Sequence, residues 1–382
     1  MENKEKLIKK LLNGSITSSE LDELLSLIDL QDFRNLIKRI FDLNEGTITN
    51  NSSASKGILG FLNKISSKRK IRNIRKKLNR PGFRDDKKLI IAEGDSWFEY
   101  PVFIKDIIDW IIKDTDNPVY SLAYGGDWIS NIIYEEQYIP ELSMYQPEVF
   151  LISGGGNDLV GDGRLSVLVN KPSLVDFSET EEDVKLKEKI ISQNFDNGEI
   201  NAVQRADMIV RGTKYLNNDF YGLMKTFEIM YKLFFKRIEL SKKFDDMKII
   251  TQGYDFVIPS NNKTIFKNPL KWVTNNGKWL YYPLVRKGIS DKYEQQSILS
   301  AMIYYFNEML ISVGEYCNKN KGTNYVFHID SRGALKEKEW SDELHPTSKS
   351  FRKISNVYIK CINEIASFDS ENPNIYPVRK YI

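Results

Sequence analysis

From residue 88 onward, the hydrophobic positions form short apolar runs that are separated by longer stretches with helical periodicity. Runs of this kind are typical of strands that are buried on both faces of a parallel sheet. One of the intervening stretches, Gln295–Leu310, is strongly helical. The alternation predicts a three-layer α/β/α domain with five parallel strands, whose carboxyl ends form the edge where an active site lies. The five predicted strands are Leu89–Ala92, Val119–Ala123, Val149–Ser153, Lys248–Thr251 and Tyr325–Ile329.

The interval between the third and fourth predicted strands, about residues 160–246, is much longer than one crossover helix requires. It contains an amphipathic helical pattern, so we predict a helical insertion at this point. The insertion either caps the active site or only completes the scaffold. The apolar positions of the helical pattern are Tyr221, Met224, Phe227, Met230, Tyr231 and Phe234.

The pattern of apolar residues over positions 1–43 predicts a set of short helices. Thr17 and Glu20 have the spacing of a capping box, which would begin one of them. This region is either a helical extension that packs on the main domain or a separate module that binds a protein partner or a second copy of the chain. Its apolar residues form two stripes at helical spacing: Leu21, Leu24, Leu25 and Ile28, then Phe33, Leu36, Ile37, Ile40 and Phe41.

Residues 44–87 join these helices to the predicted α/β domain at residues 88–382. Residues 44–59 are polar and typical of a linker. Residues 61–80 carry nine Lys or Arg residues and no acidic residue, with apolar residues interspersed. This basic segment is either an amphipathic helix that lies on an anionic membrane surface, or a solvated helix face or loose tether to the catalytic domain.

Composition narrows the range of partners. The formal net charge is only +3 at pH 7, so no strong overall field attracts nucleic acid, and we expect no nucleic-acid partner. The two cysteines, Cys317 and Cys361, do not have the spacing of a zinc site or a disulfide framework. A reducing compartment fits this cysteine usage. The sequence contains no recognisable export signal or membrane-spanning run, so a cytoplasmic location is expected.

Three of the predicted strands run into turns that carry residues suited to ester hydrolysis. Ser96 follows Gly94-Asp95 after the first strand, near a helix N-terminus with exposed backbone amides. Gly126 lies in the turn after the second strand, where the backbone can approach a substrate with its N–H free to donate. Asn157 follows the third strand, and its NH₂ group can point at a developing oxyanion. Each turn taken alone is also an ordinary strand-to-helix turn.

A serine that acts as a nucleophile needs a base with a pKa near neutrality, and the chain has only two histidines. His328 lies inside the predicted strand Tyr325–Ile329, as a core histidine does. His345 follows Asp342 by three residues, a spacing that lets the carboxylate reach the imidazole Nδ1–H. The pattern therefore predicts Ser96 as the nucleophile, His345 as its base and Asp342 as the group that orients the base.

In their order along the chain, these four segments resemble the SGNH/GDSL hydrolase superfamily of serine esterases and lipases. The resemblance covers about residues 88–362 and implies a flavodoxin-like parallel sheet. Trp97 stands where the family name has Leu. In this respect the chain resembles a bacterial branch with a Gly-Asp-Ser-Trp motif, and the motif does not specify a substrate. The matching segments are Gly94-Asp95-Ser96, Gly126, Gly155-Gly156-Asn157-Asp158 and Asp342-Glu343-Leu344-His345.

The resemblance implies two-step acyl transfer without a metal or an organic cofactor. The oxyanion of the tetrahedral intermediate would be bound by the backbone N–H groups of Ser96 and Gly126 and by the side-chain amide of Asn157. Near the nucleophile, Trp97, Phe98 and Tyr100 are predicted to line an apolar substrate pocket.

The sequence is compatible with more than one substrate and more than one biological role. An apolar pocket together with the basic segment indicates a lipid or phospholipid ester, and an acetylated carbohydrate is the alternative. A further hypothesis is a signalling or defence effector whose hydrolase activity is controlled by the N-terminal helices. A catalytically inactive binding module on the same fold is disfavoured, because all four segments are complete.

Overall fold

The computed structural model describes residues 2–12, 16–29, 32, 74, 87–100, 104–261, 279–365 and 374–382. The predicted linker at 44–59 lies outside the described residues. So do the basic segment at 61–80, apart from Ile74, and the second apolar stripe at 33–41.

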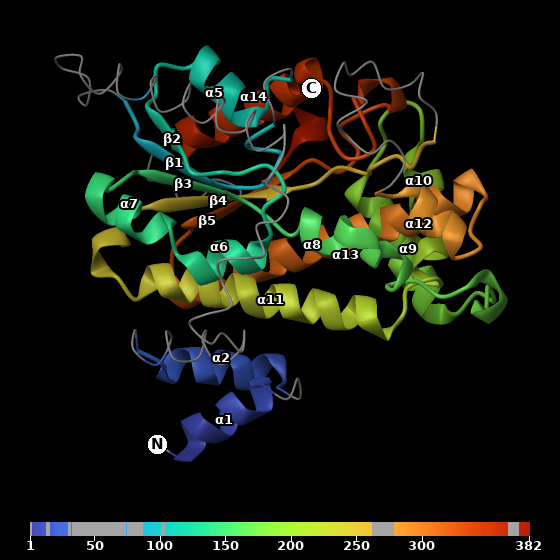
Figure 1. The fold of residues 1–382 in the computed structure, drawn as a ribbon, viewed down its shortest axis with the longest axis horizontal. Coiled ribbons are helices and arrows are strands. Elements are labelled where there is room, and N and C mark those ends of the chain that lie inside the picture. The colour runs from blue at the N-terminus through green and yellow to red at the C-terminus, as the bar shows by residue number, and fades with distance from the viewer. Residues whose placement is uncertain are drawn as a thin grey trace.

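A sheet of six parallel strands lies at the centre of the α/β domain, in the order β2-β1-β3-β4-β5-β6 (Figure 1). The predicted three-layer α/β/α class is confirmed, and all five predicted strands are present. The prediction of five strands missed β6, a short, half-buried strand that pairs with β5 at the edge of the sheet. With three residues and a terminal proline, β6 has no apolar run that a sequence pattern would reveal. The strands are β1 (Ile90–Gly94), β2 (Val119–Ser121), β3 (Val149–Ser153), β4 (Lys248–Gly253), β5 (Val326–Asp330) and β6 (Ile375–Pro377).

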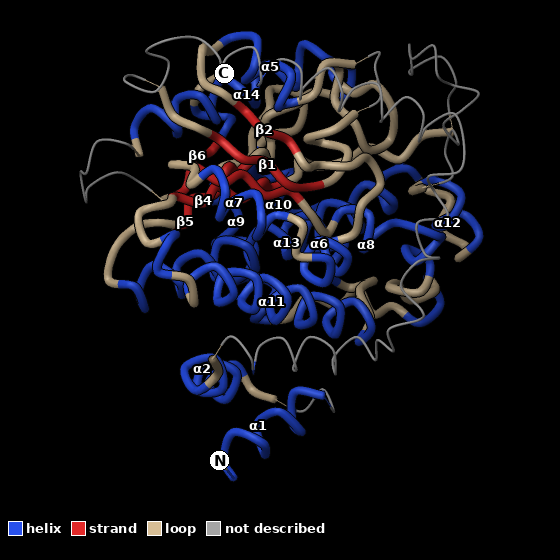
Figure 2. The backbone as a smooth tube through the Cα atoms, turned by 60° about the vertical axis from the view of Figure 1, so that its left-hand side comes forward, coloured by secondary structure: helices blue, strands red, loops and turns tan. Residues whose placement is uncertain are grey.

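Helices cover both faces of this sheet (Figures 1 and 2). One face is covered by α5 (Ile107–Asp114) and α14 (Ser348–Glu364), which pack on each other. The opposite face is covered by α6 (Ile129–Glu135), α11 (Asn218–Glu239) and α13 (Lys292–Lys321). Because water is excluded from both faces, every residue of β1, β3 and β5 is buried, which explains the continuous apolar runs in the sequence.

Most of the remaining helices lie in the connections between the strands. The α-helices among them are α7 (Tyr138–Tyr145), α8 (Gly156–Val160), α9 (Glu181–Gln193), α10 (Ala202–Thr213) and α12 (Tyr281–Arg286). Short 3₁₀-helices occupy Gly161–Ser166, Pro172–Leu174, Lys242–Phe244, Glu337–Glu339 and Val378–Lys380.

The long interval between β3 and β4 contains α9, α10 and α11. The apolar side of α11 is buried against α6 and α13, whereas α10 packs against α13 and α9. Of these helices, α11 is part of the layer that covers the sheet, whereas α10 is attached through α13 and α9 through α10, and the first residues of the interval reach the site described below. The buried apolar positions of α11 include Phe220, Met224, Phe227, Tyr231 and Phe234.

Two helices, α1 (Glu2–Leu12) and α2 (Ser18–Leu27), precede the α/β domain, and Figure 1 shows them beside α11. The predicted capping box is confirmed: Thr17 caps α2, and its side chain and that of Glu20 bond reciprocally to each other's backbone N–H. Leu21 and Leu24 are fully buried, and α2 contacts α11. Among the described helices, none is long and apolar enough to cross a bilayer.

Candidate active site

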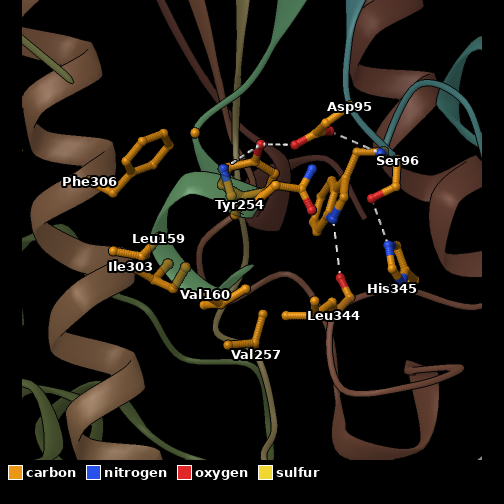
Figure 3. Close-up of a pocket in the computed structure, with 14 residues that line it drawn as sticks. Asp95, Ser96, Leu159, Val160, Tyr254, Val257, Ile303, Phe306, Leu344 and His345 are labelled. Carbon is orange, nitrogen blue, oxygen red and sulfur yellow. Dashed lines mark hydrogen bonds between the residues drawn. The ribbon is translucent and has the colours of Figure 1, made fainter. Parts of the chain in front are cut away.

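Segments that are far apart in the sequence meet at the carboxyl edge of the sheet (Figure 3). Ser96 lies in the turn after β1, Asn157 lies in α8 after β3, and His345 lies in the loop between β5 and α14. At the end of β1, a Cβ on Gly94 would lie only 2.5 Å from the Ser153 carbonyl oxygen, and its φ of 155° also favours glycine. Glycine therefore allows β1 to turn tightly against β3 just before Ser96.

Ser96, His345 and Asp342 form a continuous hydrogen-bonded chain. The Ser96 Oγ lies 2.7 Å from His345 Nε2. On the other side of the ring, His345 Nδ1 lies 2.8 Å from Asp342 Oδ1 and 2.9 Å from Asp342 Oδ2. When the ring proton is on Nδ1, the Nδ1–H group donates a hydrogen bond to the carboxylate. Nε2 is then left free to accept the serine proton. This geometry can activate a hydroxyl nucleophile.

The Asp342 carboxylate is buried and well supplied with donors. Its Oδ1 accepts the backbone N–H groups of Leu344 and His345, both at 2.8 Å. Its Oδ2 accepts the Tyr100 hydroxyl at 3.1 Å. Burial alone would raise the pKa of Asp342, but the His345 ring and these N–H donors together hold it below its usual value. Asp342 is therefore ionised at neutral pH and able to stabilise an imidazolium.

Aromatic residues fix the position of the imidazole. The Tyr100 ring packs edge-on against His345, with 4.6 Å between the ring centroids. Trp97 donates its indole N–H to the Leu344 carbonyl at 3.1 Å, which attaches the histidine loop to the Ser96 turn (Figure 3). The Trp279 ring lies 6.1 Å from the imidazole.

A second buried carboxyl, Asp95, joins three strand ends beneath the nucleophile. It accepts the Trp97 backbone N–H at 3.1 Å and the Ser153 hydroxyl at 2.9 Å, and it also accepts the Tyr254 hydroxyl. The Tyr254 oxygen in turn accepts the Gly156 N–H at 3.2 Å. Burial raises the pKa of Asp95. Sequence reasoning missed Tyr254, and its only signal is its place directly after β4.

The candidate oxyanion donors lie in adjoining turns. Asn157 donates its side-chain amide to the Asp127 carbonyl at 2.9 Å, which ties α8 to the turn after β2. That turn contains Gly126, which has a φ of 92°, and a Cβ there would meet nothing within 4 Å. The same turn is bonded to the end of β1, because the Tyr124 N–H donates to the Gly94 carbonyl at 2.8 Å. The turns that carry Ser96, Gly126 and Asn157 are thus held in one hydrogen-bonded group.

An apolar cavity of about 40 Å³ adjoins Ser96 and His345. A space of about 10–15 Å³ is enough for one water molecule, so this cavity has room for only a few heavy atoms. Of the residues predicted to line it, Trp97 does so, whereas Phe98 packs against Tyr358 in the core and Tyr100 supports the histidine. The apolar walls are formed by Leu159, Val160, Tyr254, Val257, Ile303, Phe306 and Leu344 (Figure 3).

Glu343, inside the Asp342–His345 loop, binds backbone groups rather than solvent. It is 1% exposed. Its Oε1 accepts the N–H groups of Ser260 at 3.1 Å and Tyr281 at 2.9 Å. Its Oε2 accepts the N–H groups of Trp279 and Leu280, both at 3.3 Å. The loop that carries His345 is thereby attached to the segments at 260 and 279–281, a connection that the sequence did not indicate.

The other histidine has the predicted core position. His328 is 3% exposed in β5, with Nδ1 2.8 Å from the Thr251 hydroxyl. Burial lowers its pKa to about 4, so it is neutral at physiological pH. Cys317 and Cys361 are both buried, and they do not form a disulfide with each other. Within the described ranges, no cluster of three or more His, Cys, Asp or Glu residues is arranged to hold a metal ion.

Comparison with known proteins gives distant likenesses among solved structures. No family model matches the chain, and no curated protein matches it. Among solved structures, it is similar to a family 3 carbohydrate esterase of Clostridium thermocellum, with a TM-score of 0.35 and 11% identity over 74% of this chain and 98% of that one. It is also similar to a mutant of Axe2, an acetyl-xylooligosaccharide esterase from Geobacillus, with a TM-score of 0.33 and 10% identity over 75% and 97% of the two chains. At these values neither likeness bears on activity.

Proposed function

We propose that this protein is a serine hydrolase that cleaves carboxylic esters through an acyl-enzyme. The proposal depends on one observation above all, the 2.7 Å approach of the Ser96 hydroxyl to a histidine whose other nitrogen is bonded to a buried aspartate. His345 takes the proton of Ser96 as Oγ attacks the ester carbonyl, and then gives it to the leaving alcohol. A water molecule, activated in the same way, releases the acid and restores Ser96.

In this proposal the negative oxygen of the tetrahedral intermediate is bound by three donors. They are the backbone N–H groups of Ser96 and Gly126 and the side-chain amide of Asn157. An amide NH₂ has two hydrogens, so Asn157 can keep its bond to the Asp127 carbonyl and still donate to an oxyanion. The existing bond fixes the plane of the amide, as a pre-organised oxyanion site requires.

Cavity size favours a short acyl group over the lipid chain that the sequence first suggested. The apolar space beside Ser96 measures about 40 Å³, which suits an acetyl group or one slightly larger. An octanoyl chain has roughly nine heavy atoms and exceeds this space, so most of it would lie outside the cavity. We therefore infer that the substrate is an acetyl ester or a similar short-chain ester.

The test is a comparison of p-nitrophenyl acetate with p-nitrophenyl octanoate on the full-length protein. We expect kcat/KM for the acetate to exceed that for the octanoate by at least about tenfold. Ser96→Ala should lower turnover of the acetate by at least roughly a thousandfold, because the nucleophile is lost. A fluorophosphonate probe should label the native chain and not the variant.

Ser192→Ala is the matched control, since Ser192 is exposed on α9 and its hydroxyl only bonds the Lys189 carbonyl. It should keep full activity and full labelling. Retention of turnover and labelling in a folded Ser96→Ala variant would rule out the proposed mechanism. A preference for octanoate would leave the mechanism intact and overturn the short-acyl assignment.

A further inference from the structure

A second and larger cavity lies at the same edge of the sheet. It measures about 600 Å³ and is formed by the α9–α10 connection, the start of α10, the first turns of α13 and the segments that follow β4 and β5. Val257 lines both this cavity and the apolar one beside Ser96. The two cavities are therefore neighbours that share one wall residue.

Arg205 of α10 is the charged group that lines this larger cavity while remaining almost fully buried. The side chain is 5% exposed, and its guanidinium carbon lies 4.3 Å from the centre of the Phe256 ring. One guanidinium nitrogen, Nη1, donates to the Ser300 hydroxyl at 3.1 Å. In the described part of the chain, Nε has no hydrogen-bond partner and no carboxylate forms an ion pair with the guanidinium.

The carboxylate that acts on Arg205 from a distance is already engaged. Asp255 accepts the N–H groups of Phe256 and Gly333, both at 2.7 Å, and of Leu335 at 2.8 Å. Burial lowers the pKa of Arg205 to about 10, which still leaves it charged at neutral pH. A buried cation whose direct partner is a neutral hydroxyl is costly, because it has lost most of its hydration without gaining a counterion.

The acidic residues around the cavity are committed to other partners. Glu337 forms an ion pair with Lys292 at 3.0 Å. Asp291 caps α13 by accepting the Glu294 N–H at 2.9 Å, and Glu199 accepts the Glu337 N–H at 2.8 Å. Asp291 and Glu199 keep their charges but are exposed to solvent, whereas Arg205 is the buried charge of the lining and has no carboxylate bonded to it among the described residues.

We propose that this cavity binds an anionic oxygen group, a carboxylate or a phosphate, with Arg205 as its counterion and Ser300 beside it. A guanidinium has five N–H donors in a planar fork that matches both groups. The neighbouring apolar cavity takes the short acyl group in the proposed function. On that basis the substrate is a short-chain ester of a molecule that also carries a carboxylate or a phosphate, such as an acetylated uronic acid or an acetylated sugar phosphate.

The first test measures binding without catalysis. Inorganic phosphate and methyl glucuronoside are titrated separately into the full-length Ser96→Ala protein by calorimetry. We expect at least one of them to bind with a millimolar or tighter Kd, and Arg205→Gln in the same background to weaken that binding by at least about tenfold. Two results would overturn the proposal. One is that neither probe binds to Ser96→Ala. The other is that a folded Arg205→Gln variant binds both probes as tightly as Ser96→Ala does.

A second pair of variants decides the question if Arg205→Gln does not fold. Ser300→Asp places a carboxylate next to Arg205 and should compete with the probe, so that binding falls by at least about tenfold. Ser300→Asn has the size of the aspartate variant without its charge, and it should weaken binding much less than Ser300→Asp. Equal affinity of the two variants for the probe would contradict the assignment.

A kinetic comparison separates this proposal from the proposed function. Acetylated methyl glucuronoside and acetylated methyl glucoside carry the same ester and differ only in the carboxylate. We expect a higher kcat/KM for the uronate by about tenfold or more, and loss of this preference in Ser300→Asp. If neither these esters nor p-nitrophenyl acetate is cleaved, the hydrolase proposal fails while the calorimetry still decides the anion site. If both are cleaved equally, the cavity does not select the substrate.

Discussion

At the scale of single residues, the candidate site is notable for how many groups restrain one imidazole. Asp342 fixes Nδ1, the Tyr100 ring packs against the side of His345, and the Ser96 hydroxyl lies at Nε2. Tyr100 serves two partners, because its hydroxyl also donates to Asp342. A base that is held in this way loses little entropy when the transition state forms, which favours rapid proton transfer.

Glu343→Gln should lower kcat/KM for p-nitrophenyl acetate by roughly tenfold without abolishing activity. The carboxylate accepts four backbone N–H groups with its two oxygens. A glutamine can place an oxygen at only one side, and its NH₂ then faces N–H donors on the other. The loop that carries His345 should therefore move, and kcat should fall more than KM rises. Steady-state kinetics on purified protein measure this.

The control for that substitution is Glu188→Gln on α9, where the glutamate is exposed and removal of its charge should leave the kinetics unchanged. If Glu343→Gln keeps the full kcat/KM, the four N–H bonds hold the fold without influencing His345.

At the scale of elements, the close crossing of α10 and α13 positions both the scaffold and Arg205. Gly212 lies where the two helices meet, and a Cβ at this residue would lie 1.9 Å from the Ser297 carbonyl oxygen. That neighbour is helix backbone, so it cannot turn aside as a flexible side chain would. Glycine at this position is required by helix packing rather than by backbone conformation.

Gly212→Ala should destabilise the protein by about 1–3 kcal/mol, because α10 and α13 must separate to admit the methyl group. Gly222→Ala on α11 is the matched control, since a Cβ there would meet nothing within 4 Å. That change should stabilise the fold by roughly 0.5–1 kcal/mol through the better helix propensity of alanine. Urea unfolding curves of both variants give these values, and equal effects would refute the packing argument.

At the scale of the whole molecule, several buried acids hold protons more tightly in the folded chain than in the unfolded one. Burial raises the pKa of Glu93 to about 8, those of Asp158, Asp255 and Glu343 to about 7, and that of Asp127 to about 6. The unfolded chain releases these protons near pH 4. The folded state is thus favoured below that pH by these groups, and this contribution is lost as the pH rises toward about 8.

Two kinds of group act in the opposite direction over lower pH ranges. His328 has its pKa lowered to about 4, so its contribution to stability rises with pH between about 4 and 6.5. The pKa values of Asp330 and Asp342 are lowered, and their contributions are lost only in stronger acid. Above about pH 5, the acids with raised pKa values outnumber these groups and dominate the change of stability with pH. The melting temperature should therefore fall between about pH 5.5 and about pH 8.5.

Glu93→Gln should reduce this loss of stability, because it removes the carboxyl with the highest of these pKa values. The melting temperature of the variant minus that of the native chain should be more positive near pH 8.5 than near pH 5.5. Each unit of pKa shift corresponds to about 1.4 kcal/mol. Calorimetric melting at both pH values measures this. Glu179→Gln, at an exposed loop position, is the control and should give the same difference at both.

Much of the fold was determined by the sequence alone, because the relevant forces act over a few residues. Apolar runs typical of strands that are buried on both faces predicted five of the strands. The spacing of Thr17 and Glu20 predicted the N-terminal cap of α2. The candidate residues Ser96, Asp342 and His345 could be named because each lies in a short segment with a recognisable local form. The strand β6 was missed because three residues carry too little pattern.

Only the tertiary structure decided which of these segments meet. Ser96 and His345 are 249 positions apart, and no local pattern specifies the 2.7 Å between their side chains. The bonds of Tyr254 to Asp95 and of Glu343 to four backbone amides depend in the same way on how distant segments pack. That Arg205 has no counterion among the described residues could not be read from the chain either, because it is a property of everything that surrounds the group in space.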